Sequence, residues 1–241
     1  MKVKHLLISR VAVKWNHPQL GWRHEEINML WDDWVKDSIQ LYDKYCRPSL
    51  RQQTDQDFTL LSLVDENIKE FGNILENEVL IKLKSEGDFI KRIVNGINSY
   101  IETIKDEYEY IIVTRIDRDD CLRKDYVSNV KKGMLDGKIT EKYLDLYFSY
   151  TYDVKKDIVY DSHKYYVTVS PFVSTMERIK EGKIRCVSFI VDHNIVPTLL
   201  NGRKANNLVA IQVIHENNLR NMVVGKEIKI NYNDFNLKRN G

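Results

Sequence analysis

Short apolar runs alternate with longer amphipathic stretches over the first 135 residues of the chain. A short run rich in β-branched residues predicts a buried strand, and apolar residues that recur every three or four positions predict a helix. By these patterns, strands are expected at residues 5–11, 58–64, 79–83 and 110–114, and helices at 24–45, 68–77, 89–104 and 124–134. Because strands and helices alternate, this part predicts a mostly parallel sheet with right-handed crossover connections.

The rest of the chain is patterned differently and favours short strands over long helices. Strands are expected at residues 143–152, 157–160, 165–169 and 210–215, a short helix at 174–181, and either a strand or the start of a helix at 187–192. The polar tail, residues 226–241, is expected to be peripheral. We therefore predict a single α/β, Rossmann-like domain whose mostly parallel central sheet is flanked by helices. Its parallel half covers about residues 1–135, and a mixed half covers about residues 136–225.

The strand expected at 110–114 runs into a cluster of three carboxylates, Asp117, Asp119 and Asp120. Carboxylate oxygens are preferred ligands of Mg²⁺ and Mn²⁺, and ligands of α/β sheets bind at the carboxyl ends of strands. One interpretation is therefore a divalent metal that holds a substrate phosphate. The alternative is an acidic turn in which Asp120 or a neighbour caps the next helix. The spacing alone does not decide between the two.

Other expected strands also end in side chains suited to a nucleotide. Arg10 follows the first strand, where its guanidinium could bind a phosphate or could be an ordinary surface arginine. Asp65 ends the second strand, where it could accept hydrogen bonds from a base or ribose, or could cap the following segment. His215 ends the last expected strand.

Composition narrows the class of protein. A net charge of +2 over 241 residues gives no support for a nucleic-acid partner. The three cysteines are far apart and odd in number, which argues against a disulfide framework. The chain contains no C-x-x-C motif, which argues against a structural zinc site. No apolar run is long enough for a signal peptide or a membrane span, so we expect a soluble, cytoplasmic protein.

Several common site motifs do not occur. The chain has no G-x-G-x-x-G, no G-x-x-x-x-G-K-[ST] and no G-x-S-x-G. Their absence counts against a dinucleotide-binding Rossmann fold, a P-loop and a serine-hydrolase elbow.

The order of blocks along the chain resembles the GT-A glycosyltransferases and, more narrowly, a family of rhamnosyltransferases. The blocks that carry the narrower resemblance are Ser9-Arg10, the Pro48-Ser49-Leu50, Gln53-Thr54 and Phe58 pattern, Thr114-Arg115-Ile116-Asp117-x-Asp119-Asp120, and Val213-Ile214-His215-x-x-Asn218. Together they span roughly residues 6–218. The chain departs from the pattern at Val11, where we expect an aromatic residue. It also departs at Arg118, which replaces a small or neutral residue and could alter substrate or metal preference.

This resemblance implies transfer of a sugar from a nucleotide-sugar donor, with Mn²⁺ or Mg²⁺ as cofactor. It implies that Asp119 binds the metal directly, that Asp117 meets the ribose or a metal-bound water, and that His215 completes the metal shell. It also implies that Asp65 faces the base, and that Ser9, Arg10 and Arg115 line the nucleotide and its phosphates.

An enzyme that inverts the sugar's configuration also needs a base for the acceptor hydroxyl. Asp192, which ends an apolar run and precedes His193, is the first candidate, with Asp153 and Asp161 as rivals. If configuration is retained, Asp192 need have no such role.

The expected function is therefore sugar transfer to a glycan or lipid-linked glycan acceptor in surface polysaccharide synthesis. A position at the inner face of the membrane stays open, although no basic amphipathic helix requires one. A nucleotidyltransferase or a metal-dependent phosphohydrolase could use the same carboxylates, but residues 14–23 contain only Gly21 and form no glycine-rich phosphate loop. A non-catalytic sugar-binding module is a third class, and the presence of all three carboxylates counts against it.

Overall fold

The computed structural model describes residues 2–14, 16–17, 22–23, 31–72, 74–138, 140–162, 169–216 and 223–238. Most of the segment from residue 15 to residue 30 therefore lies outside the described residues. So do Asn218 and all but the last residue of the strand expected at 165–169.

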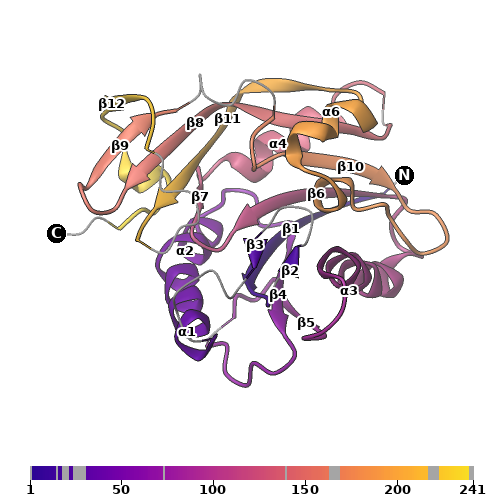
Figure 1. Cartoon of the computed structure of the whole chain (residues 1–241). Coiled ribbons are helices and arrows are strands. Elements are labelled where there is room, and N and C mark those ends of the chain that lie inside the picture. The colour runs from indigo at the N-terminus through magenta and orange to yellow at the C-terminus, as the bar shows by residue number, and fades with distance from the viewer. Residues whose placement is uncertain are drawn as a thin grey trace.

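The first half of the chain forms four parallel strands (Figure 1). They are β1 (Val3–Ala12), β4 (Thr59–Asp65), β5 (Glu78–Leu83) and β6 (Tyr110–Asp117). Their order across the sheet is β5–β4–β1–β6, and all three pairings are parallel. Strands β4 and β5 are added on one side of β1, and β6 is added on the other side of β1. The switch point between β1 and β6 is where an open α/β sheet binds its ligand.

The second half continues the same sheet with mixed pairing. Its strands are β7 (Cys121–Leu122), β8 (Lys142–Asp153), β9 (Ile158–Asp161), β10 (Ser174–Arg178), β11 (Gly202–Ile214) and β12 (Lys226–Ile228). Strand β10 runs antiparallel to both β6 and β8 and so joins the two halves. Strand β11 runs parallel to β8 and antiparallel to β7. The expectation of an α/β fold with a parallel first half and a mixed second half is confirmed.

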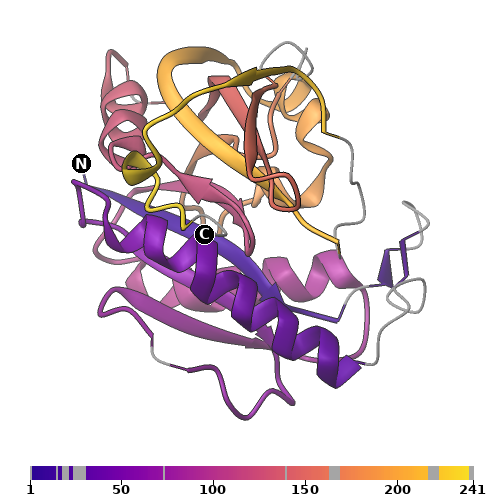
Figure 2. The same ribbon diagram turned by 90° about the vertical axis from the view of Figure 1, so that its left-hand side faces the viewer.

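Helices cover both faces of the parallel strands, as the two views show (Figures 1 and 2). On one face, α1 (Trp31–Leu41), a π-helix (Tyr42–Cys46) and α2 (Arg47–Arg51) follow one another without a break, and α3 (Phe89–Ile104) lies on the other. The shorter helices are α4 (Tyr126–Leu135), α5 (Val187–Ile190) and α6 (Val196–Leu199), with 3₁₀ turns at His193–Ile195 and Tyr232–Asp234. Two-residue strands β2 (Asn16–His17) and β3 (Trp22–Arg23) pair with each other.

Helix α3 shows how local sequence fixes one of these layers. The carboxylate of Asp88 accepts the N–H of Lys91 at 2.8 Å and so caps the helix start. Ile93, Ile97 and Ile101 form its buried stripe. A Cβ at Gly96 would lie 2.4 Å from the side chain of Leu83, so glycine allows α3 to approach the sheet closely.

Alternation along β1 separates two hydrophobic cores. Leu6 and Ile8 pack with the α3 stripe, whereas Leu7 and Val11 pack with α1, the π-helix and α2. The same alternation places Arg10 on the α3 face and Ser9 on the opposite face.

Two expected helices are wrong. Residues 68–77 form no helix in their described part, because Gly72 adopts a φ of +72° and the N–H of Leu75 is bound by the carboxylate of Glu78 at 2.9 Å. The apolar spacing there serves to bury Ile68 and Phe71 without a helix. Residues 174–181 contain β10 instead, because its backbone is paired on both sides.

The strand expected at 165–169 and the start of the helix expected at 24–45 fall outside the described residues, and the other expected elements match, most of them with shifted ends. The late strand is much longer than residues 210–215, and residues 187–192 begin as helix α5. Pro48 stands in the first turn of the short helix α2, a position that tolerates its missing N–H. The segment expected to be a peripheral tail supplies the edge strand β12 and buries Phe235 and Leu237 in a third core.

Within the described residues, no helix is both long enough and apolar enough to cross a bilayer.

Candidate functional site

The candidate site lies where β1 and β6 end side by side. Arg10 and Asp117 are direct register partners on these two strands. Nη2 of Arg10 lies 2.7 Å from Oδ1 of Asp117, and Nη2 of Arg115 lies 4.0 Å from Oδ2 of the same carboxylate. Two guanidinium groups therefore share one carboxylate at the switch point of the sheet.

This pairing determines the charge of Asp117. Burial alone would raise the pKa of its carboxyl group, but the charges of Arg10 and Arg115 outweigh burial and hold that pKa well below its usual value. Burial and the nearby charge of Arg10 also lower the pKa of Arg115. Asp117 is therefore a fixed anion held between cations at neutral pH.

The next carboxylate, Asp119, makes a different contact. Its Oδ2 lies 2.9 Å from Nε2 of His215, which directly follows β11, and both side chains are only 9% exposed. A buried carboxylate beside an imidazole can form a hydrogen bond, an ion pair or two ligands of a metal ion. The residue expected from the end of the last strand is thus brought to the acidic cluster.

Asp120 is committed to the backbone. Its Oδ1 accepts the N–H of Val213 at 3.1 Å, and its own N–H donates to the carbonyl oxygen of Asp117 at 3.2 Å. Burial and the neighbouring charges of Asp119 and Asp117 raise the pKa of its carboxyl group well above the usual value. Asp120 fastens the acidic turn to β11.

The three residues expected around the metal, Asp117, Asp119 and His215, are not assembled into one cluster. Among the residues that the structure describes, no three His, Cys, Asp or Glu side chains form a group able to hold a metal ion. Asp119 and His215 form one pair, whereas Asp117 is turned toward the arginines. A carboxylate and an imidazole still fit a metal that takes its remaining ligands from substrate phosphates and water.

Asp192 lies on the arginine side of the site. It caps the turn that follows α5, and its Oδ1 accepts from the backbone and the side-chain amide of Asn194 at 2.9 and 2.8 Å. Partial burial would raise the pKa of this carboxyl group, but the bonds from Asn194 and the charges of His193 and Arg115 lower it. Helix α5 lies against β6, and the charges of Asp192 and Arg115 each shift the pKa of the other, so this carboxylate lies on the same side of the sheet as Arg115.

The two rival carboxylates lie on β8 and β9. Asp153 is the register partner of Ile214, directly before His215, and it accepts the N–H groups of Lys155 and Lys156 in the turn from β8 to β9, whereas Asp161 ends β9. Of the three candidates for the base, Asp192 is the one whose charge acts on Arg115.

Two further predicted residues have different surroundings. Asp65, at the end of β4, is 1% exposed, and its Oδ1 accepts from the hydroxyl of Ser85 at 2.6 Å, whereas its buried Oδ2 has no partner within the described part of the chain. This orphan oxygen suits a donor group on a ligand. Ser9 is completely buried on the opposite face of the sheet from Arg10 and is not brought together with the other site residues.

The structure also explains why Ser49 and Gln53 stand in the blocks that carry the resemblance. The hydroxyl of Ser49 accepts the N–H of Leu122 at 3.2 Å, and the side chain of Gln53 binds the N–H of Val127 and the carbonyl oxygen of Arg123. Both residues hold the segment that leaves the acidic turn. They position the site without belonging to it, a role that the sequence did not reveal.

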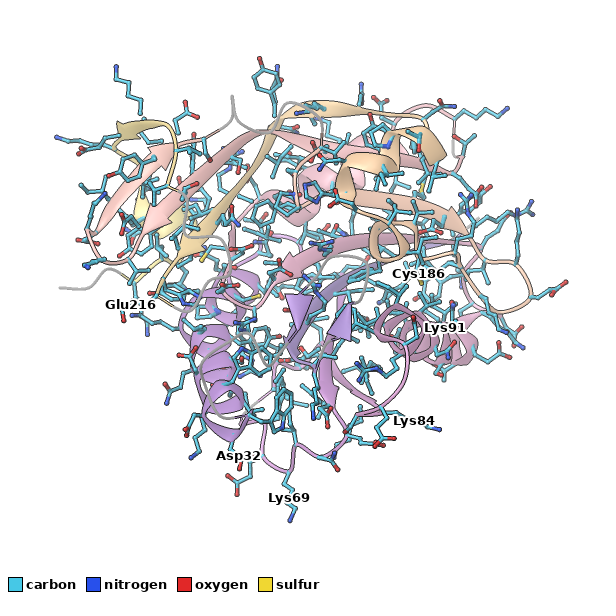
Figure 3. All side chains as sticks on the ribbon, in the orientation of Figure 1. Asp32, Lys69, Lys84, Lys91, Cys186 and Glu216 are labelled. Atoms are coloured by element: carbon cyan, nitrogen blue, oxygen red, sulfur yellow. The ribbon has the colours of Figure 1, made fainter. Side chains whose placement is uncertain are left out.

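Arg118, within the acidic motif, is a neighbour of the site that sequence reasoning marked only as a departure. Its guanidinium lies 5.0 Å from the ring centroid of Trp34 on α1. Figure 3 labels one residue from each side of the site. Glu216, next to His215, lies toward α1 and α2, and Cys186, just before α5, lies beside α3.

Comparison with known proteins shows the class of protein. The family match defines a transferase of the glycosyltransferase class. The chain belongs to the family described as "Putative rhamnosyl transferase", whose model matches residues 7–218. No curated protein matches the chain in sequence.

Among solved structures, the chain is similar to one described as a "putative nucleotide-diphospho-sugar transferase" from Desulfovibrio desulfuricans G20. The two share 8% sequence identity with a TM-score of 0.40, over 84% of this chain and 79% of that one.

Proposed function

We propose that the protein transfers a sugar from a nucleoside-diphosphate donor to a hydroxyl of a glycan, in a reaction that depends on Mn²⁺ or Mg²⁺. The observation that carries the proposal is the buried pair of Asp119 and His215 beside the Arg10–Asp117 pair at the switch point. A ligand there would meet two potential metal ligands and two guanidinium groups. This is the chemistry that a diphosphate leaving group requires.

Each residue then has a role that follows from its place. Asp119 and His215 would hold the metal, which as a Lewis acid stabilises the charge that develops on the leaving diphosphate. Arg10 and Arg115 bind phosphate oxygens from the α3 side of the sheet. Asp65 binds the base or ribose through its orphan oxygen.

Asp192 takes the proton from the acceptor hydroxyl. Its lowered pKa keeps it ionised at neutral pH, and it lies near Arg115, so acceptor and donor phosphates would meet between them. This role applies to a reaction that inverts the sugar's configuration.

The setting of the reaction is also proposed. The donor is a nucleotide sugar, and the acceptor is a glycan or a lipid-linked glycan used in surface polysaccharide synthesis. The reaction then takes place in the cytoplasm, in solution or at the inner face of the membrane, without nucleic acid.

Thermal unfolding tests the proposal. The protein is heated with each of a panel of nucleoside diphosphates and nucleotide sugars, with and without Mn²⁺. A ligand at a hundredfold excess over its Kd stabilises the folded state by about 2.7 kcal/mol, so one nucleotide should raise Tm by several degrees when Mn²⁺ is present.

Two variants give this experiment its control. Asp119→Asn should remove the part of the shift that depends on Mn²⁺, whereas Asp136→Asn, which changes an exposed carboxylate after α4, should leave it unchanged. If no nucleotide shifts Tm with any metal, the proposed function is wrong.

A further inference from the structure

The acidic motif divides its carboxylates between two sides of the site. Asp119 contacts His215 at 2.9 Å, while Asp117 contacts Arg10 at 2.7 Å. Asp120 stands between them and is bound to the backbone of β11. A shared metal would require Asp117 to leave its arginine partners.

Both oxygens of Asp117 face guanidinium groups. Oδ1 accepts from Nη2 of Arg10, and Oδ2 lies 4.0 Å from Nη2 of Arg115. These contacts are also well sheltered, since the side chains of Arg10 and Arg115 are 27% and 15% exposed. Charge-assisted bonds in such surroundings are stronger than at an open surface.

The arginines keep donors that this carboxylate does not use. The Nε atoms of Arg10 and Arg115 are buried and have no hydrogen-bond partner within the described part of the chain. Each guanidinium carries five N–H donors in a fixed plane, so fixing one edge on Asp117 aims the others. Arg10, Arg115 and Arg118 together carry one more charge than the ionised carboxylates of Asp117 and Asp192, and this excess of positive charge suits an anion.

We propose that Asp117 is not a metal ligand but a positioning residue, which aims the guanidinium groups of Arg10 and Arg115 at the diphosphate of the donor. The inference deepens the proposed function and rests on it for the identity of the anion. The diphosphate is then bound from two sides, by the arginines on one and by the metal side of Asp119 and His215 on the other. The arginine side binds a diphosphate without any metal.

Inorganic pyrophosphate in EDTA is the probe, because it tests the arginine side without a nucleotide and without a metal. Wild type should bind it in a calorimetric titration. Arg10→Gln and Asp117→Asn should each weaken binding by about tenfold, the usual scale for loss of a charge-assisted bond. The double variant should be no weaker than either single one, because the two residues act as one unit.

A titration with Mn²⁺ alone, monitored by electron paramagnetic resonance, tests whether Asp117 is a metal ligand or a positioning residue. Asp119→Asn should weaken Mn²⁺ binding, and Asp117→Asn should leave it unchanged. Arg10→Lys should recover part of the pyrophosphate affinity that Arg10→Gln loses. Arg178→Gln, at the opposite end of the sheet beside Glu109, should bind pyrophosphate as wild type does.

Three results would overturn the inference. The first is that wild type does not bind pyrophosphate in EDTA, and the second is that the double variant loses the product of the affinity losses of Arg10→Gln and Asp117→Asn. The third is that Asp117→Asn and Asp119→Asn lose equal Mn²⁺ affinity. Unfolding curves show whether each variant is folded, and Arg10→Lys, which keeps the positive charge, tests the role of Arg10 with a smaller change of side chain. The proposed function fails separately. If pyrophosphate binds as expected but no nucleoside diphosphate binds more tightly than pyrophosphate, the arginine site stands and the nucleotide-sugar donor does not.

Discussion

Asp192 combines two properties that a base for a hydroxyl needs. Its carboxylate is held by Asn194, and it is close enough to Arg115 for each charge to alter the pKa of the other. It is also ionised, since its pKa is lowered from the ordinary value. Orientation and charge are thus set before an acceptor binds.

Asp192→Asn should lower kcat by about 10²–10⁴-fold, the usual contribution of a positioned general base, and change donor binding little. Because the pKa of Asp192 is lowered, the wild-type base stays ionised down to about pH 4, and loss of activity from its protonation should occur only below that pH. Steady-state kinetics measure the change in kcat, and a wild-type profile from pH 5 to 8 should show no loss of activity from this group.

Asp136→Asn is the matched control for Asp192, since it changes an exposed carboxylate after α4. It should keep kcat. If it lowers kcat as much as Asp192→Asn does, the loss does not come from a base at Asp192.

At this scale the sequence marked the residues of the candidate site but not the contacts within it. Asp117, Asp119 and His215 could be singled out because carboxylates and an imidazole stand at expected strand ends. Their division between arginines and histidine depends on strand register, which places Arg10 opposite Asp117. The burial of Ser9 depends on which face of β1 turns toward α1. Neither property can be obtained from residue types and spacing.

At the scale of elements, a hydrogen-bonded chain crosses three strands on one face of the sheet. Nε2 of His5 on β1 lies 2.8 Å from the hydroxyl of Thr114 on β6, which lies 2.7 Å from the hydroxyl of Ser174 on β10. This chain joins the parallel half to the first antiparallel strand. Burial, the largest cause, lowers the pKa of His5 to about 3.

That shift predicts a loss of stability in acid. Between pH 6.5 and 3 the unfolded chain binds a proton at His5 that the folded chain does not, so the free energy of unfolding falls as pH falls through this window. At pH 4.5 the loss is about 2–3 kcal/mol from this group alone. Urea unfolding of wild type and His5→Gln at pH 7 and 4.5 measures it.

His5→Gln keeps a side chain able to bond Thr114 but does not titrate, so its loss of stability between the two pH values should be smaller. If wild type and His5→Gln lose equal stability between pH 7 and 4.5, His5 is not the cause of the loss in acid.

Elements whose structure is decided locally were predicted well. Helix α3 has the expected bounds because its stripe of isoleucines and its Asp88 cap lie in one continuous segment. Strand β10 was mistaken for a helix because its conformation is imposed by β6 and β8, which lie far from it in the chain. The segment around Gly72 failed for a more local reason, since Gly72 adopts a positive φ and Glu78, directly after the segment, binds the N–H of Leu75.

At the scale of the whole molecule, the last described segment packs against elements of both halves of the chain. Phe235 is 3% exposed and packs edge-on against Tyr150, with ring centroids 6.4 Å apart. The carbonyl oxygen of Asp234 accepts the N–H of Lys124, and the side chain of Asn236 donates to the carbonyl oxygen of Pro48. A polar composition hid this role, because only a few apolar residues in the segment are buried.

Phe235→Ala should lower the free energy of unfolding by about 3–5 kcal/mol, as for other large core side chains. Leu135→Ala, at a leucine that is 42% exposed at the end of α4, should change it by about 0.5 kcal/mol or less. Urea unfolding of both variants measures the contrast. Equal effects would mean that the segment does not contribute to the core.

The pairing of β7 with β11 has a consequence for how such a chain can be divided. Immediately after the acidic turn, Cys121 and Leu122 pair with Ile211 and Ala210, and Asp119 meets His215 a few residues further along. A fragment that ends near residue 135 would keep the parallel strands and lose the imidazole, the partner of β7 and the anchor of Asp120. The two halves therefore cannot be exchanged between relatives as separate modules, because a chimaera joined between them would have to match the acidic turn of one parent to the β11 of the other.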